Sequence, residues 1–231
     1  MAPLPQKVGV LVVGSGNAGF AAALSAAENG AKDILIIDKC PEEWVGGNSY
    51  FTAGAYRIAH NGLQDLLPIV NNVSPEQADK IDLTPYTVKD FQDDMERVCM
   101  GRSDPVLARA LIENSNEAIK WLASNGIRFQ LSFNRQAYEV DGRIKFWGGL
   151  HIKTQDGGKG LIEDYLAATK KRNIHVSWST ALTGLQKRSK DDNYDVEVSI
   201  NGKQRVFTAG DRKSTRLNSS HSGESRMPSS A

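Results

Sequence analysis

The sequence is poor in the residues that mark several classes of protein. It holds two cysteines, Cys40 and Cys99, and four histidines in 231 residues. Two cysteines exclude a disulfide-built scaffold and a four-cysteine zinc site, and no histidine pair has the H-E-x-x-H spacing of a zinc protease. We therefore expect no metal site, and the few cysteines favour a reducing, cytoplasmic compartment.

Net charge and long hydrophobic runs are also scarce. A formal charge of +1 gives no basic field for a nucleic acid. Apolar runs such as Val8–Val13 are too short to cross a bilayer, and Met1–Lys7 lacks the apolar stretch of a secretory signal. We therefore predict no nucleic-acid partner and no membrane span. With 40% hydrophobic and 24% charged residues, the chain has the composition of a globular protein.

The last segment, Asp211–Ala231, differs from the rest in composition. Seven of its 21 residues are serine, and only Leu217, Met227 and Ala231 are apolar. Because it cannot bury a core, we expect it to be disordered. It resembles the translation of a sequencing-library adapter, and a natural serine-rich terminus is the alternative. The folded body is therefore predicted to be 1–210, an incomplete N-terminal part of a longer domain.

A glycine-rich turn lies between two apolar segments near the start of the chain. Lys7–Val13 predicts a buried strand, Phe20–Asn29 a helix that ends at Gly30, and Ile34–Ile37 a second strand. The turn reads G-S-G-N-A-G, and Asp38 follows 19 residues after its last glycine. A G-x-G-x-x-G turn in this strand–helix–strand context, with an acid beyond it, indicates a dinucleotide-binding fold.

Each glycine of the turn has a mechanical role. Gly14 permits the tight turn, Gly16 lets a pyrophosphate approach the backbone, and Gly19 lets the helix pack close to the sheet. The helix N-terminus offers N–H groups and a partial positive charge to the phosphates. Asp38 suits a ribose diol, and Lys39 is a solvated residue at the strand end. The motif does not separate NAD from FAD, and a tight turn without a ligand is the alternative.

A second run of small and polar residues follows where an NAD domain would continue with alternating strands and helices. Residues 46–57 read G-G-N-S-Y-F-T-A-G-A-Y-R. An extended cofactor such as FAD needs a second contact zone along its pyrophosphate, ribityl chain and flavin, and such a loop beside the first supplies it. A mobile surface loop is the alternative. The small apolar run Ala53–Ala59 predicts a short packed helix instead of a mobile loop.

Together, the two glycine segments resemble the flavoprotein family of fumarate reductases and succinate dehydrogenases, the FAD-dependent oxidoreductases of type 2. Within it, the nearest likeness is to tricarballylate dehydrogenase-like proteins. The resemblance covers 5–210, and its further matches are residues 90–98, 101–129, 133–149 and 156–161. It implies an α/β, Rossmann-like FAD-binding fold with a parallel sheet, a helical insert at about 61–150 and a small antiparallel β-meander.

The resemblance also implies which residues contact FAD. Those at the pyrophosphate are Gly14, Ser15, Gly16, Ala18 and Gly19. Those at the adenosine are Asp38 and Lys39 beside the ribose, and the backbone of Ala181 at the adenine. Those along the pyrophosphate, ribityl chain and flavin are Gly46, Gly47, Asn48, Ser49, Thr52, Ala53 and Gly54. Some relatives attach the flavin to a histidine where this chain has Asn48, so we predict non-covalent FAD.

The reaction that the resemblance implies is hydride transfer between flavin and a CH–CH bond of a small carboxylic acid, such as a tricarballylate-like or fumarate/succinate-like substrate. The family's acid–base and carboxylate-binding residues lie beyond residue 210, so the catalytic residues are unknown, as is the electron partner. Two alternatives remain. One is a ketosteroid-dehydrogenase-like flavoenzyme, and the other is a nucleotide-binding fragment without catalytic activity.

Other segments predict the surrounding structure. Thr87–Met100 predicts a helix, and Asp104-Pro105 starts another that Gly126 ends. The expected buried stripe of that helix is Val106, Ala110, Leu111, Ala118, Ile119 and Leu122. Ile174–Trp178 predicts a third parallel strand, and Asn201-Gly202 a hairpin turn between Asp195–Ile200 and Gln204–Thr208.

Three sites in the middle of the chain are candidates for a functional role. The run Phe146–Gly149 either packs in the core or lies near a substrate. His151 is either a hydrogen-bonded structural histidine or an acid, a base or an anion ligand, because its intrinsic pKa lies near neutrality. Lys159, within the glycine-rich run Gly157–Gly160, is a candidate carboxylate contact.

Overall fold

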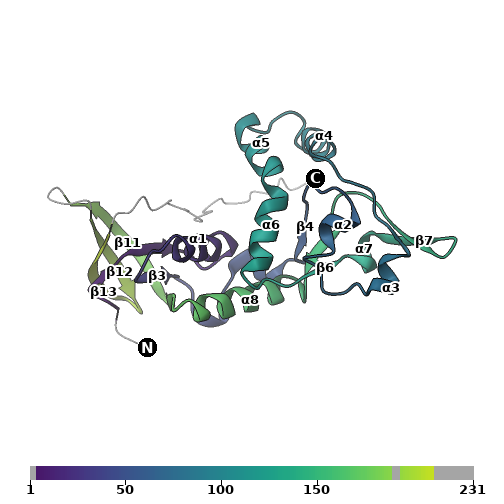
Figure 1. Ribbon diagram of the computed structural model, residues 1–231. Helices are drawn as coiled ribbons and strands as arrows, with labels where there is room; N and C mark the ends of the chain where they lie inside the picture. Colours follow the sequence, from purple (N-terminus) through teal and green to yellow (C-terminus); the bar gives the residue numbers. More distant parts are fainter. Residues whose placement is uncertain (1–3, 189–192, 211–231) are drawn as a thin grey trace, which may run out of the picture. The chain divides into compact units, whose positions relative to one another are not determined.

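The protein is described here by a computed structural model that covers residues 4–188 and 193–210, so the predicted tail Asp211–Ala231 lies outside the described residues. The chain divides into two compact units. The first unit contains the chain up to Val45 and from Arg172 onward, and the second unit is Gly46–Lys171. The predicted insert, 61–150, lies within the second unit. Figure 1 labels the elements of both.

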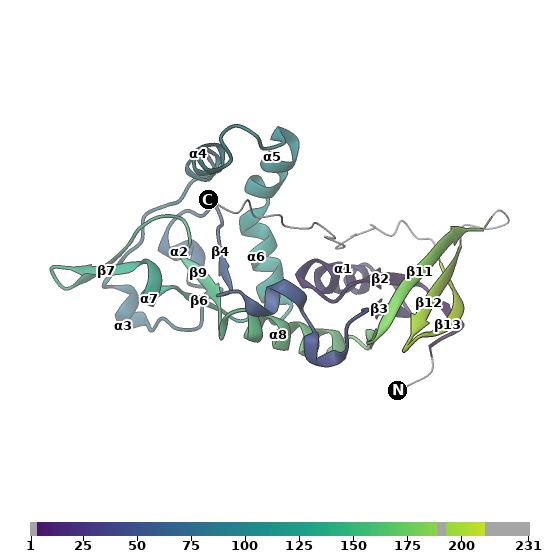
Figure 2. The same cartoon turned by 180° about the vertical axis from the view of Figure 1, so that it is seen from behind.

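A three-stranded parallel sheet lies in the first unit. Its strands are β2 (Val10–Val13), β3 (Ile34–Ile37) and β10 (His175–Ser177), in the order β10-β3-β2. All four residues of the central strand β3 are buried. Helix α1 (Asn17–Glu28) joins β2 to β3 and packs on them through Phe20 and its neighbours (Figure 2). The predicted strand–helix–strand unit and its third parallel strand are confirmed.

A second sheet of four strands completes the first unit. Its strands are β1 (Lys7–Val8), β11 (Thr180–Lys187), β12 (Tyr194–Ile200) and β13 (Lys203–Ala209), in the order β1-β13-β12-β11. Strands β11 to β13 pair antiparallel and form the predicted meander. Asn201 and Gly202 both have positive φ, +48° and +80°, as the predicted hairpin turn requires. A short 3-10 helix, Glu42–Trp44, follows β3.

The run Lys7–Val13, predicted as one strand, is divided at Gly9 between the two sheets. β1 pairs with β13, whereas β2 pairs with β3. The N–H of Gly9 donates to the carbonyl of Asp33 at 3.0 Å, and a Cβ on Gly9 would overlap the carbonyl oxygen of Lys32. The single-strand prediction is wrong because a distant segment pairs with the chain at this glycine, which local hydrophobicity does not reveal.

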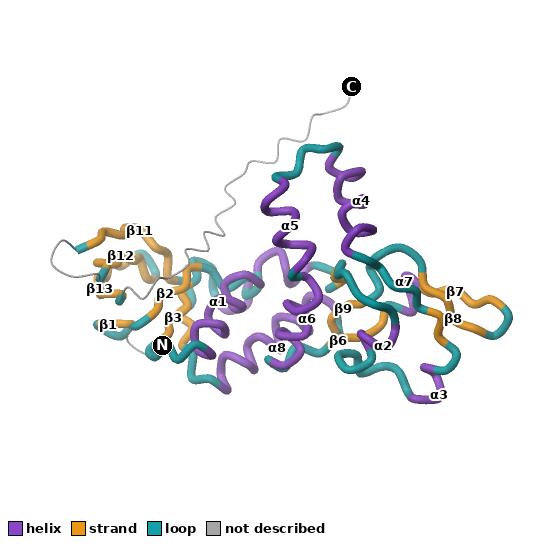
Figure 3. Tube along the Cα trace, turned by 45° about the horizontal axis from the view of Figure 1, so that its top comes forward, coloured by secondary structure: helices purple, strands orange, loops and turns teal. Residues whose placement is uncertain are grey.

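The second unit contains two small sheets. The strands β4 (Ala55–Tyr56), β6 (Phe129–Leu131) and β9 (Ile152–Thr154) pair antiparallel in the order β4-β9-β6. The strands β5 (Ile81–Asp82), β7 (Ala137–Val140) and β8 (Arg143–Phe146) form the other sheet, in the order β5-β8-β7. Figure 3 separates these strands from the helices by colour. The region predicted as a helical insert therefore alternates helices with strands.

The helices of the second unit include two with predicted starts. They are α2 (Leu63–Leu66), α3 (Pro75–Ala78), α4 (Val88–Cys99), α5 (Pro105–Glu113), α6 (Ser115–Ser124), α7 (Phe133–Gln136) and α8 (Gly157–Lys171). Helix α4 begins with a capping box between Thr87 and Asp90. Asp104 caps α5 by accepting hydrogen bonds from the N–H groups of Val106 and Leu107. Both predicted helix starts are confirmed.

The single helix predicted between Asp104 and Gly126 is two helices, because the backbone leaves helical geometry at Asn114. Asn114 has φ −95° and ψ 0°, and its side chain donates to the carbonyl of Ala110 at 2.7 Å. The break changes which face each half buries: Val106 is 74% exposed and Leu111 57% exposed. The predicted stripe is therefore wrong at these two positions and also at Ala110 and Ala118, which are exposed. The buried apolar residues of α5 and α6 are Ile112, Ile119 and Leu122.

The run Ala53–Ala59 does not form the predicted short helix. Gly54 has φ +68°, and its carbonyl accepts a hydrogen bond from the N–H of Thr154 at 2.8 Å. Ala55 and Tyr56 then pair with β9. The helix prediction is wrong because the backbone groups of this run are used in a sheet. A short 3-10 helix, η2 (Gly47–Phe51), lies earlier in the same glycine-rich segment.

Candidate functional site

The first glycine turn connects β2 to α1 in the first unit. The N–H of Gly14 donates to the carbonyl of Ile37 at 2.8 Å, which fixes the turn beside the end of β3. Gly16 is the N-cap of α1, no described side chain caps the helix, and its first turn holds no acidic residue. The positive end of the helix dipole is therefore not neutralised by a carboxylate of its own first turn, which suits a phosphate.

Gly19 is the position of closest packing in this turn. A Cβ built on Gly19 would overlap the carbonyl oxygen of Gly14 and would lie 3.6 Å from Cγ1 of Val12 on β2. Any other residue would push the helix away from the turn and the strand. This agrees with the packing role predicted for the third glycine, although its first neighbour is the turn itself.

Asp38 joins the end of β3 to the glycine turn. Its Oδ2 accepts hydrogen bonds from the backbone N–H of Ser15 at 2.7 Å and from the Ser15 hydroxyl at 2.6 Å. Its Oδ1 accepts a hydrogen bond from the N–H of Cys40 at 2.8 Å. The carboxylate is half-buried, and Lys39 beside it is exposed. Asp38, which is predicted to bind a ribose, thus also fixes the predicted phosphate-binding turn by its hydrogen bonds to Ser15.

The second glycine segment is anchored at both ends within the second unit. A Cβ on Gly46 would overlap the side chain of Ile162 on α8, and a Cβ on Gly54 would overlap Oγ1 of Thr154. Between these anchors, the N–H of Gly158 donates to the carbonyl of Thr52 at 2.9 Å. Helix α8 and strand β9 therefore fix the segment in place.

Between its anchors, the second segment presents small residues to solvent. Gly47, Asn48, Thr52 and Ala53 are exposed, and a Cβ on Gly47 would meet no atom within 4 Å. Ser49 is half-buried, and its carbonyl accepts a hydrogen bond from the Thr52 hydroxyl at 2.9 Å. The segment thus offers backbone and small polar groups, and its one large exposed side chain is Phe51, which packs against Tyr50.

The predicted cofactor residues divide between the two units. Those in the first unit are Gly14, Ser15, Gly16, Ala18, Gly19, Asp38, Lys39 and Ala181, the last of which lies on the edge strand β11 opposite Ser199. Those in the second unit are Gly46, Gly47, Asn48, Ser49, Thr52, Ala53 and Gly54. The structure brings Ser15 and Asp38 together in one unit. Joint binding of one cofactor by both sets stays a prediction.

Two buried histidines form a contact that the sequence did not reveal. The Nε2 atom of His60 lies 2.7 Å from Nδ1 of His151, and each residue is only 4% exposed. Burial and the neighbouring imidazole lower the pKa of His60 to about 4. Burial also lowers the pKa of His151. The two residues are 91 positions apart, and no local pattern predicts such a pair.

A charged network lies beside this pair. The guanidinium of Arg57 donates to the Tyr86 hydroxyl and to Asp94, both at 2.6 Å. Arg97 donates to the other oxygen of Asp94 at 2.8 Å. Burial, followed by the Asp94 hydrogen bond, raises the pKa of Tyr86 to about 12. The network joins the end of β4 to α4, and neither Arg57 nor Tyr86 was singled out from the sequence.

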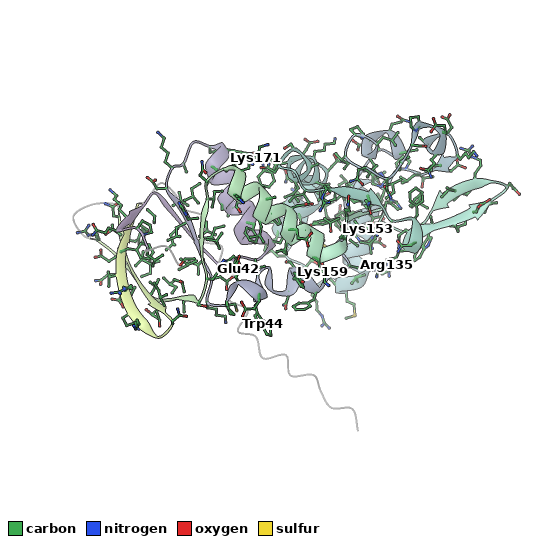
Figure 4. The ribbon with its side chains drawn as sticks, turned by 90° about the horizontal axis from the view of Figure 1, so that it is seen from below. Glu42, Trp44, Arg135, Lys153, Lys159 and Lys171 are labelled. Carbon is green, nitrogen blue, oxygen red and sulfur yellow. The ribbon has the colours of Figure 1, made fainter. Side chains whose placement is uncertain are left out.

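The remaining candidate positions have distinct surroundings. Phe146 is buried, whereas Trp147 beside it is 58% exposed. Lys159 projects from the first turn of α8, and its Nζ lies 5.8 Å from the centre of the Tyr50 ring (Figure 4).

Among the described residues, no cluster of three metal-ligating side chains was found. None of the described helices is both long and apolar enough to cross a membrane.

Comparison with known proteins agrees with this geometry. The family described as FAD binding domain matches residues 9–215. The NADH:fumarate oxidoreductase of Klebsiella pneumoniae (strain 342) is 32% identical over 192 residues, which cover 77% of this chain and 17% of that protein. The chain spans 17 to 33% of the length of the curated relatives it matches.

Solved structures share the fold. The open conformation of a flavocytochrome c3 fumarate reductase matches with a TM-score of 0.60 and 23% identity, over 89% of this chain and 32% of that one. A 3-ketosteroid-Δ4-(5α)-dehydrogenase from Rhodococcus jostii RHA1 matches with a TM-score of 0.62 and 17% identity, over 90% of this chain and 45% of that one. With the family match over most of its length, this chain belongs to the FAD binding domain family that includes the fumarate reductase flavoproteins.

Proposed function

We propose that this chain is part of an FAD-dependent oxidoreductase that transfers hydride between flavin and a carbon–carbon bond of a small carboxylic acid. The observation that carries the proposal is the pair of hydrogen bonds that Asp38 accepts from Ser15. It holds an acidic acceptor beside a glycine turn whose helix N-terminus has no side-chain cap among the described residues. That pairing of an anion site with a hydroxyl acceptor suits the diphosphate and ribose of a dinucleotide.

The acceptor capacity of Asp38 fits this role. An ionised carboxylate has about four lone-pair positions, and Asp38 uses three of them for Ser15 and Cys40. One position remains for a ribose hydroxyl. A 2′-phosphate at the same place would be repelled by the carboxylate, so the predicted ligand carries a free diol.

The second segment supports FAD over a shorter nucleotide. Gly47 and its exposed neighbours Asn48, Thr52 and Ala53 give a strip of backbone that a flat ligand can approach closely. Gly46 and Gly54 hold that strip against Ile162 and Thr154. Because an asparagine amide does not form the covalent flavin bond, we propose that Asn48 leaves FAD bound without a covalent link.

When bound, FAD would supply the electron transfer as hydride exchange at the flavin, while the chain would bind and orient it. The substrate class rests on relatives such as the NADH:fumarate oxidoreductase. Within that class, we propose a tricarballylate-like or fumarate/succinate-like acid. No catalytic residue of the described chain is assigned, and the electron partner stays open.

Flavin release tests the cofactor part of the proposal. We expect protein produced with FAD to show flavin absorbance bands, and acid precipitation to leave the flavin in the supernatant. A yellow pellet would contradict non-covalent binding. Protein without flavin absorbance would instead favour a nucleotide-binding fragment of another specificity.

Substrate-dependent flavin reoxidation tests the reaction. In the whole protein, reduced flavin should be reoxidised by fumarate or by the unsaturated acid that corresponds to tricarballylate. Reoxidation by a dehydrogenated ketosteroid but by neither acid would favour the ketosteroid-dehydrogenase-like alternative.

A further inference from the structure

The two histidines of the second unit form a chain of hydrogen bonds with a fixed direction. The backbone N–H of Gly62 donates to Nδ1 of His60 at 3.1 Å. Nδ1 of His60 is therefore an acceptor and carries no proton. Because burial holds His60 neutral near pH 7, its single proton lies on Nε2. That proton faces Nδ1 of His151 at 2.7 Å, so His151 in turn carries its proton on Nε2.

The last group in this series of hydrogen bonds, the Nε2–H of His151, is a donor without an acceptor among the described residues. Nε2 of His151 is buried and has no hydrogen-bond partner among the described residues. The carbonyls of Trp147 and Gly148 are close enough to raise the pKa of His151, but they do not complete a hydrogen bond. Since buried polar groups are nearly always paired in folded proteins, an unpaired N–H in a fixed tautomer indicates a partner supplied from outside the chain.

Two further unpaired polar atoms belong to residues whose backbones are hydrogen-bonded to the segment 147–151. Oε1 of Gln136 and Oγ of Ser132 are buried and also lack partners among the described residues. Their backbones join the same segments: the N–H of Ser132 donates to the His151 carbonyl at 2.9 Å, and the N–H of Trp147 donates to the Gln136 carbonyl at 3.1 Å. Buried unpaired polar atoms thus lie on segments that hydrogen bonds join to the one carrying His151, while the rings of Tyr86 and Phe146 flank the His151 ring.

The sheet connects this region to the predicted flavin segment. Gly54 accepts a hydrogen bond from the N–H of Thr154, and β4 then pairs with β9 up to Tyr56 opposite Ile152. His151 directly precedes β9, and Arg57 directly follows β4. At a rise of about 3.3 Å per residue, Arg57 lies about 10 Å along the strand from Gly54. The donor therefore lies near the end of the same strand pair that begins at the predicted cofactor contact.

The charge beside the donor favours an anion. Burial is the main cause that lowers the pKa of His151, and the positive charge of Arg57 lowers it further. Arg57 and Arg97 share the single carboxylate of Asp94, so this network carries one net positive charge. Asp65, the acid that acts on His60, is itself paired with Lys120 at 3.0 Å. A neutral imidazole N–H beside a net positive network suits a carboxylate oxygen.

We propose that His60 and His151 form a relay that presents the Nε2–H of His151 to a carboxylate oxygen of the substrate, beside the turn Phe146–Gly149. His151 is the contact residue, and His60 is a positioning residue that fixes its tautomer. The inference rests on the proposed function, because it takes its ligand class from there. It gives His151 one of the two interpretations that the sequence left open, as an anion ligand, and adds His60 as the residue that positions it.

Nitrogen NMR of the imidazoles tests the relay directly in the FAD-bound protein. We expect both histidines in the Nε2–H tautomer, and addition of fumarate should shift the Nε2 signal of His151. In His60→Phe, which removes the donor to Nδ1, a population of the Nδ1–H tautomer of His151 should appear. His60→Gln keeps an N–H donor and should restore the Nε2–H form. A mainly structural histidine would show no response to fumarate.

Fumarate affinity tests the contact. Loss of a hydrogen bond to a charged group predicts that His151→Phe weakens fumarate binding about ten- to a hundredfold, with FAD affinity unchanged. His151→Gln, which keeps a donor, should recover part of the loss. The exposed His175 on β10 supplies the matched control, and His175→Gln should bind fumarate as the wild type does.

The outcomes separate this inference from the proposed function. FAD binding is read from flavin absorbance before fumarate is added, so protein that holds no FAD contradicts the proposed function itself. Protein that holds FAD but shows no response of His151 to fumarate overturns the relay and leaves the cofactor assignment standing. A wild-type His151 in the Nδ1–H tautomer, or one paired with a trapped water that fumarate does not displace, also overturns it.

Discussion

The two glycine-rich segments are held in place by different kinds of contact. The first turn is fixed by its immediate neighbours in the fold, Ile37 at the end of the next strand of the same strand–helix–strand unit and Asp38 directly after it. The second segment is fixed by Thr154 and Ile162, which lie 100 or more residues further along the chain. One segment therefore depends on a local unit, and the other on the return of a distant strand and helix.

This difference predicts where each segment is sensitive. The first turn depends on hydrogen bonds to one carboxylate, which are worth a modest free energy each. The second depends on close packing of backbone against backbone and side chain, where a single added carbon is costly. Substitutions should therefore affect the two segments by different amounts and through different measurements.

The largest expected effect is at the second segment. In Gly54→Ala, the added Cβ overlaps Oγ1 of Thr154 and approaches the backbone of Gly157 to 2.8 Å, at a residue with φ +68°. Left-handed geometry and overpacking together predict a loss of about 4 kcal/mol in the free energy of unfolding of the second unit. Hydrogen exchange resolved by peptide measures this loss separately for each unit.

The matched control is Gly47→Ala in the same segment. Gly47 also has positive φ, +50°, but no atom lies within 4 Å of its Cβ position. We expect a loss of about 1 kcal/mol, from backbone geometry alone. Equal losses for the two variants would show that packing against β9 and α8 does not hold the segment.

Acidification is expected to have the next largest effect, again on the second unit. His60 titrates at a pKa of about 4 in the folded protein and at about 6.5 when unfolded. Its contribution to stability is complete above pH 6.5 and is lost as the pH falls toward 4, because the unfolded chain then binds a proton that the folded chain does not. The expected loss is about 3 kcal/mol.

Urea unfolding at a series of pH values, followed by hydrogen exchange, tests this expectation. His60→Gln removes the His60 titration and should reduce the pH dependence of the second unit, with the part due to His151 remaining. If the first unit, whose described histidine His175 is exposed, lost stability equally over this range, the His60–His151 pair would not be its cause.

The smallest effect concerns the first turn. Asp38→Asn removes the charge that accepts hydrogen bonds from Ser15 and should cost about 2 kcal/mol in the first unit. Flavin fluorescence should also show FAD affinity reduced about tenfold. Asp33→Asn, an exposed change in the same unit at a residue with φ +53°, is the control and should change neither quantity. An intact FAD affinity in Asp38→Asn would argue against the ribose contact.

Elements governed by near neighbours could be predicted from the sequence. The strand–turn–helix from Val10 to Glu28 and the hairpin at Asn201-Gly202 follow from hydrophobic runs and turn residues alone. The starts of α4 and α5 follow from capping residues within one turn. In each case the residues that decide the structure lie within a few positions of it.

Two of the wrong predictions share one physical cause, and a third has a local cause. Within Ala53–Ala59, the pair Ala55–Tyr56 is a strand because β9 returns to pair with it, and Lys7–Val13 is split because Asp33 bonds to Gly9. In both, pairing with a distant segment overrode local preference. Val106 and Leu111 are exposed because Asn114, through a hydrogen bond within its own helical turn, ends the helix and changes the buried face.

The sequence by itself determined the dinucleotide turn, because small residues, a buried strand and a following acid must meet within one strand–helix–strand unit. It also determined the family to which the chain belongs. Only the tertiary structure decided that Asp38 braces Ser15, that Gly54 lies against Thr154, and that His60 fixes the tautomer of His151. These contacts join residues 23 to 100 positions apart, and hydrogen bonds and close packing at that separation exist only once the chain has folded.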